Sequence, residues 1–153
     1  MRAVLPAHGK EAHRCNGPDP IPVLVHLKIF TDTTAVAAGD DARRFVVTDD
    51  LGGTRLRSVH ASVTTVGSGA TVVQVHNLTN ADDLLSTRTT IDASETTSYT
   101  AATPHVVNTT GTPPINYITR GDVLRIDVDT AGSGAKGLEV LLEFGPNVIR
   151  VTP

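Results

Sequence analysis

Two runs near the end of the chain decide its fold: GDVLRIDVD at 121–129 and LEVLLEF at 138–144, joined by the link TAGSGAKG at 130–137. In both runs every second residue is apolar, and most of the residues between are charged. A period of two puts the apolar side chains on one face of an extended strand and the charged ones on the other. The pattern therefore predicts two half-buried strands, and the glycine-rich link predicts that they form a β-hairpin.

Short runs of the same kind occur along the rest of the chain, separated by segments rich in Gly, Asp, Asn and Pro that favour turns. The link VGSGA at 66–70 predicts a second hairpin, and the small polar residues of 92–104 predict at most one helical turn. Eight to ten short strands without a long helix are typical of an antiparallel β-sandwich or a jelly-roll-like fold. The further strands are predicted at 23–30, 43–48, 55–65, 71–77, 84–91, 105–108 and 115–118, and residues 147–152 either add one last edge strand or reach across to a neighbour.

The composition narrows the function classes. A length of 153 residues suits one domain. The net charge is −3, and the sequence has no cluster of basic residues that would bind nucleic acid or a membrane surface. No apolar run approaches the roughly 20 residues that span a bilayer, and the first residues lack the pattern of a signal peptide. The single Cys15 has no partner for an internal disulfide, so we expect a thiol in a reducing compartment. We expect synthesis in the cytoplasm.

Residues 1–20 differ from the domain at 21–153. They hold several Pro and Gly residues and no apolar period, so they cannot bury enough surface to order on their own. We expect an extended N-terminal arm, held either by a partner subunit or against its own domain. The candidate partner-contact residues in and next to this arm are Val4, Leu5, Pro6, Arg14 and Ile21.

The sequence contains no strong motif of a catalytic, cofactor-binding or metal site. GSGAKG at 132–137 matches the dinucleotide pattern G-x-G-x-x-G, but a strand follows it where a helix is needed. Asp127 and Asp129 share one side of a strand and leave calcium as an alternative. His60 and His76 become neighbours only if their strands pair, and no zinc spacing or G-x-S-x-G elbow is present. We therefore expect no enzyme, no cofactor and no small-molecule substrate.

Five phrases occur in order along the chain: LLSTR at 84–88, IDASE at 91–95, SYTAATP at 98–104, GDVLRIDVD at 121–129 and AKGL at 135–138. Together they resemble a β-sandwich module of virion structural proteins of tailed bacteriophages, a group that includes head decoration (cement) proteins and some tail or fibre components. The resemblance covers roughly residues 23–145 and leaves the arm outside.

The resemblance implies a protein without enzymatic activity that binds other virion subunits, often as a homotrimer. The resulting expectation is a capsid decoration protein on the outside of the head, assembled in the host cytoplasm, that bridges subunits of the major capsid protein. The alternative is a tail or fibre module that binds host carbohydrate. Neither function involves nucleic acid or a membrane.

Overall fold

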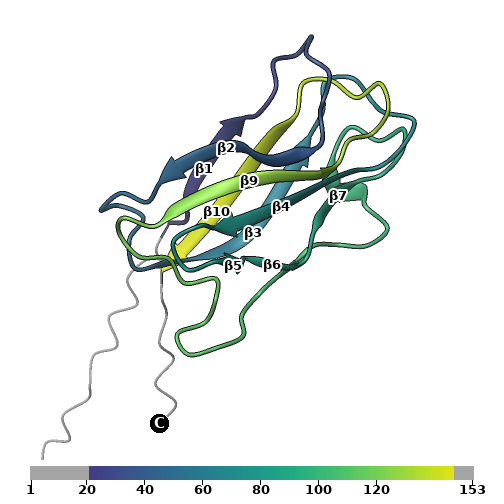
Figure 1. The fold of residues 1–153 in the computed structure, drawn as a ribbon. Coiled ribbons are helices and arrows are strands. Elements are labelled where there is room, and N and C mark those ends of the chain that lie inside the picture. The colour runs from purple at the N-terminus through teal and green to yellow at the C-terminus, as the bar shows by residue number, and fades with distance from the viewer. Residues whose placement is uncertain (1–20, 147–153) are drawn as a thin grey trace, which may run out of the picture.

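Ten strands and one 3-10 turn make up residues 21–146, the part of the chain that the computed structural model describes (Figure 1). The turn, η1 (Ser98–Thr100), lies inside the segment predicted to hold it. The predicted arm at 1–20 and the strand predicted at 147–152 lie outside the described residues. No helix of the described part is long and apolar enough to cross a membrane. The strands are β1 (Val23–Lys28), β2 (Gly39–Val46), β3 (Thr54–Ser62), β4 (Thr71–Asn77), β5 (Asp82–Asp83), β6 (Leu85–Thr87), β7 (Thr89–Ile91), β8 (Val106–Val107), β9 (Val123–Thr130) and β10 (Glu139–Pro146).

The strands form two sheets that pack face to face, which confirms the predicted antiparallel β-sandwich (Figure 1). One sheet has the order β1-β10-β3. The other has the order β2-β9-β4-β5, with β7 also paired to β4. A small third pairing joins β6 and β8, and all of these pairings are antiparallel.

The prediction that the two deciding runs form a hairpin is wrong. β9 is an inner strand of one sheet and β10 the central strand of the other, so the link at 130–137 crosses between the sheets. On the way it bonds to two other loops, with isolated bridges from Lys136 to Ala35 and to Thr65. Alternation specifies which face of a strand is buried but not which strand lies beside it, and two inner strands of facing sheets show the same pattern.

The second predicted hairpin is wrong for the same reason. β3 belongs to the three-stranded sheet and β4 to the five-stranded sheet, so the link at 66–70 also connects one layer with the other. This link lies against the first one, because the Ser68 N–H donates to the Ser133 carbonyl at 2.9 Å. The two glycine-rich links thus pack together at one end of the sandwich.

The core lies between the two sheets and is built from the rows that the sequence pattern predicts. The apolar rows of β9 and β10 are at most 1% exposed, and Val59 and Ala61 of β3 lie in the same cluster. The buried members of the two central rows are Leu124, Ile126, Val128, Val140, Leu142 and Phe144.

Three smaller predictions differ from the structure. β2 begins at Gly39 rather than at 43, because a bulge around Asp41, with a φ of 66°, lets the chain join the sheet earlier. The run predicted at 84–91 divides into β6 and β7, since β6 leaves the sheet to pair with β8. The strand predicted at 115–118 is a turn with one bridge, between Arg55 and Tyr117.

Candidate functional site

The two long sides of the sandwich differ in how they are closed. On one side β3 contacts β7 and η1, and the segment 96–118 bonds to its edge. The Ala61 N–H, for example, donates to Ser98 Oγ at 2.9 Å. The opposite side, formed by β1 and β2, has no further described strand beside either edge (Figure 1). We call this the open side.

The β2 edge of the open side carries features that prevent pairing with another strand. Its bulge interrupts the ladder, and the Asp41 N–H turns inward to donate to Asp127 Oδ1 at 2.7 Å. Asp41 also forms an ion pair with Arg44, and Arg43 beside it is exposed. Bulges and charged side chains are common means of protecting an edge strand from association.

The β1 edge is less protected, with a charged residue only at its end, where Lys28 pairs with Asp32 and Glu139. Its sequence, VLVHLK, contains no Pro, and its ladder with β10 runs without a bulge from Val23 to Lys28. Apolar side chains are exposed at and just before its start, with Ile21 at 87%, Leu24 at 58% and Val23 at 38%. An exposed apolar edge of this kind is a site for association with another chain.

The core is also incompletely covered at the open side. Nine apolar residues pack against the core while only partly buried, and two of them, Val107 and Ile115, lie on the closed side. Six of the nine belong to β1, to β2 or to the residues directly after β1. These residues are Val25, Leu27, Ile29, Phe30, Ala42 and Phe45.

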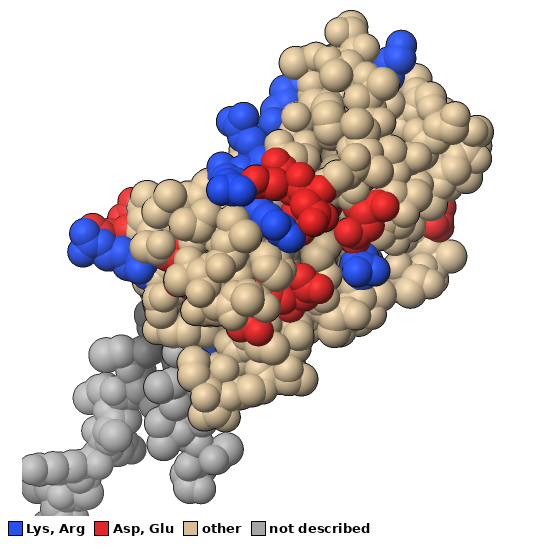
Figure 2. All heavy atoms as spheres, in the orientation of Figure 1, with Lys and Arg blue, Asp and Glu red and all other residues tan. Residues whose placement is uncertain are grey.

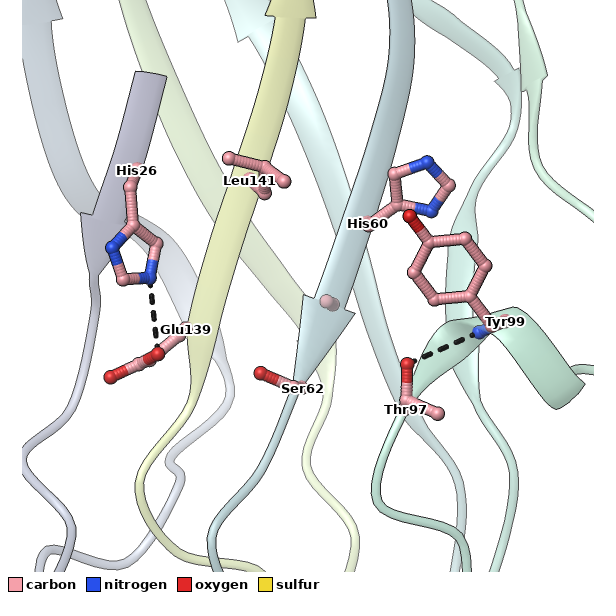
Figure 3. Close-up of a pocket in the computed structure, with 8 residues that line it drawn as sticks. His26, His60, Ser62, Thr97, Tyr99, Glu139 and Leu141 are labelled. Carbon is pink, nitrogen blue, oxygen red and sulfur yellow. Dashed lines mark hydrogen bonds and ion pairs between the residues drawn. The ribbon is translucent and has the colours of Figure 1, made fainter. Parts of the chain in front are cut away.

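A separate pocket of about 190 Å³ lies on the outer face of the three-stranded sheet (Figure 3). Leu141 of β10 lies at its centre, between His26 of β1 and His60 of β3, because the two ladders place these residues in one row. On one flank, Glu139 Oε2 lies 3.0 Å from His26 Nε2, within hydrogen-bond distance. On the other flank Thr97 and Tyr99 rise from η1 and the residue before it.

Three rings meet beside this pocket. The His60 ring stacks on Tyr99 with centroids 4.1 Å apart, and His105 approaches His60 edge-on at 5.5 Å. Ser58 Oγ lies 3.1 Å from His60 Nε2 and donates to Glu143 Oε2 at 3.2 Å. Burial lowers the pKa of His60, and the nearby Glu143 opposes this shift. The environment of His60 therefore favours its neutral imidazole near pH 7.

His105 makes stability depend on pH. Its Nε2 accepts a hydrogen bond from the Val59 N–H at 3.2 Å, which requires the neutral ring. Burial, and then the neighbouring His60, lower the pKa of His105 below its ordinary value of 6.5. The unfolded chain therefore binds the proton first as the pH falls, so this contribution is complete above about pH 6.5 and is lost below it.

We expect the midpoint of urea unfolding to fall between about pH 6.5 and pH 5 in the wild-type protein. The fall should be smaller in His105→Gln, whose amide oxygen accepts a hydrogen bond without titrating. Urea titrations of both proteins at pH 7.5, 6.0 and 5.0 check this. An equal fall in the two proteins would assign the pH dependence to other groups.

The outer face of the five-stranded sheet carries acidic and basic side chains side by side (Figure 2). The Arg125 Nε donates to Asp127 Oδ2 at 2.9 Å, and Arg88 pairs with Asp129 at 2.6 Å. Burial raises the pKa of Asp129, and Arg88 partly opposes the rise. Arginines thus occupy the two carboxylates that suggested calcium, and residues 21–146 contain no group of three or more potential metal-ligating side chains.

The structure places only one of the predicted contact residues. Ile21 lies two residues before β1, whereas Val4, Leu5, Pro6 and Arg14 fall outside the described residues. His60 and His76 are not neighbours, because β3 and β4 lie in different sheets. His76 instead pairs with Asp83 of β5 at 2.7 Å.

The pocket was missed by sequence reasoning. Its side chains come from β1, from β3 and the strand β10 beside it, and from η1 and the residue before it. No spacing in the sequence links them. No protein-family model, no curated protein and no solved structure matches the chain.

Proposed function

We propose that this chain is a structural protein that binds other protein subunits through the open side of its sandwich. More finely, we propose a capsid decoration protein of a tailed bacteriophage, which binds the outside of the head and bridges major capsid protein subunits. The observation that carries the proposal is the exposed apolar start of the less protected β1 edge, at Ile21 and Leu24.

The energetics of this surface favour a protein partner. Burying an exposed Leu or Ile side chain contributes about 1.5–3 kcal/mol, so two such residues make a useful anchor. The proposed arm at 1–20 leads directly into Ile21, so contacts made by the arm would extend this binding surface. A homotrimer would present three such anchors, and multivalent attachment increases avidity without new contacts.

The central test is binding to purified phage heads that lack their decoration protein. We expect deletion of residues 2–20, and separately the double substitution Ile21→Ser and Leu24→Ser, to reduce occupancy on the heads by about tenfold or more, a loss of about 1.4 kcal/mol or more. Quantitative gel densitometry of sedimented heads measures the occupancy.

Val106→Ser is the matched control, because Val106 of β8 is 50% exposed but lies in the segment that covers the closed side. It should leave occupancy unchanged. Full occupancy after deletion of 2–20 would refute the role of the arm, and full occupancy of the double variant would refute the role of β1.

A second candidate is a tail or fibre module that binds host carbohydrate, and the pocket on the three-stranded sheet favours it. Tyr99 is 71% exposed on one flank, Glu139 lies on the opposite flank and Ser62 lies between them (Figure 3), so the pocket offers a sugar ring an aromatic side chain, a hydroxyl and a carboxylate. Glycan binding by the isolated protein, with no affinity for heads, would select this function over capsid decoration.

A further inference from the structure

The β1 edge is open to a further strand, and residues 21–146 do not supply one. The backbone N–H and C=O groups of β1 that point away from β10 have no partner strand within these residues. The inner row of Val25 and Leu27 is only partly buried. A strand added here would satisfy the backbone groups and cover the row with its own alternate apolar residues. The occupant should therefore be extended, β-prone and apolar at every second position.

The chain carries such a sequence directly after the described part. Residues 147–152 read NVIRVT, and Pro153 follows. Four of these six residues are β-branched, Ile149 and Val151 share one face, and Arg150 lies on the other. The segment has the same number of residues as β1, which spans 6.

The sequence disfavours a simple extension of the β10 ladder within one subunit. The register of β10 with β1 pairs Phe144 with Val23, and its continuation would set 147–149 against Pro18 and Pro20, which lack N–H donors. On the other side β10 ends opposite Thr54. The residues before Thr54 form a turn with its own bonds, including Gly52 N–H to the Thr48 carbonyl at 2.9 Å.

Because the β1 edge is open and residues 147–152 have the sequence of a strand, we propose that residues 147–152 of one copy add as a strand to the β1 edge of a second copy. Ile149 and Val151 then pack beside Val25 and Leu27, and Arg150 points outward. Reciprocal exchange gives a dimer and cyclic exchange a closed ring such as a trimer. This contact joins copies of the chain through the backbone edge of β1 and its inner row, whereas the proposed capsid contact uses Ile21 and the outward-facing Leu24, so the two contacts are separate.

The test uses the full chain in a reducing buffer, with light scattering for mass and hydrogen exchange for the β1 amides. The wild-type protein should be a dimer or a closed ring. Ile149→Asp with Val151→Asp should give a monomer whose exchange at Val23–Lys28 is about tenfold faster or more. Val148→Asp with Thr152→Asp adds the same charge on the opposite face and should stay assembled.

Circular dichroism confirms that each variant keeps the sandwich. As a second measurement, an excess of synthetic peptide with the sequence of residues 147–153 should disperse the wild-type oligomer, whereas the peptide with Asp at positions 149 and 151 should not. A monomeric wild-type protein, or an oligomer that persists in the Ile149 and Val151 variant, would overturn the proposal. Because no capsid is present, neither result depends on whether the chain decorates heads.

Discussion

Replacing Gly137 with alanine is expected to lower the free energy of unfolding by about 2–5 kcal/mol, because two penalties combine there. Gly137 has a φ of +70°, a conformation that costs a residue with a side chain about 1–2 kcal/mol. A Cβ at this position would also overlap Thr64 Oγ1 and lie 2.9 Å from the Asp32 Cα. The Thr64 hydroxyl cannot move without cost, since it donates to the Asp32 and Lys136 carbonyls.

Gly134→Ala is the matched control within the same link. Gly134 has a similar φ of +83°, but a Cβ there would meet no atom within 4 Å. It should lose only the conformational part, about 1–2 kcal/mol. Urea unfolding of both variants measures the difference. Equal losses would mean that the link does not pack closely where it crosses between the sheets.

Leu142→Ala is expected to cost about 2–5 kcal/mol, because Leu142 is 0% exposed at the centre of the core and its truncation leaves a cavity. The loss would lower the urea midpoint strongly, since the whole stability of a domain is only about 5–15 kcal/mol. Chemical denaturation of the variant at neutral pH measures it.

Leu141→Ala provides the comparison at the next residue of the same strand. Leu141 points to the outer face and is only partly buried, so we expect a loss of about 1 kcal/mol or less. The two substitutions remove the same atoms, and their difference reports which face of β10 is in the core. Similar losses at both positions would contradict the observed alternation.

The faces of the strands could be predicted from the sequence, but not their neighbours. The rows of Leu124 and Leu142 are recognisable because burial on one face leaves a period of two. Pairing depends on contacts between distant residues, such as Leu141 with His60, that leave no mark in a single sequence. A glycine-rich link suits a crossing between layers as well as a tight turn, and this ambiguity produced both wrong hairpins.

The candidate surfaces show the same limit. Ile21 was predicted as a contact because it is apolar and follows the arm, and the structure places it two residues before an uncovered edge strand. Nothing in the sequence indicated that β1 would be an edge strand and β10 a central one. The stacking of Tyr99 on His60 was equally hidden, since the 92–118 segment must first cross the edge of β3.

The most direct test of the account is the structure of the assembled particle, determined by electron cryo-microscopy of decorated heads. The account predicts that Ile21 and Leu24, now 87% and 58% exposed, become buried against a neighbouring chain, with the open side facing its partners. It would be contradicted if both side chains stayed exposed to solvent in the particle.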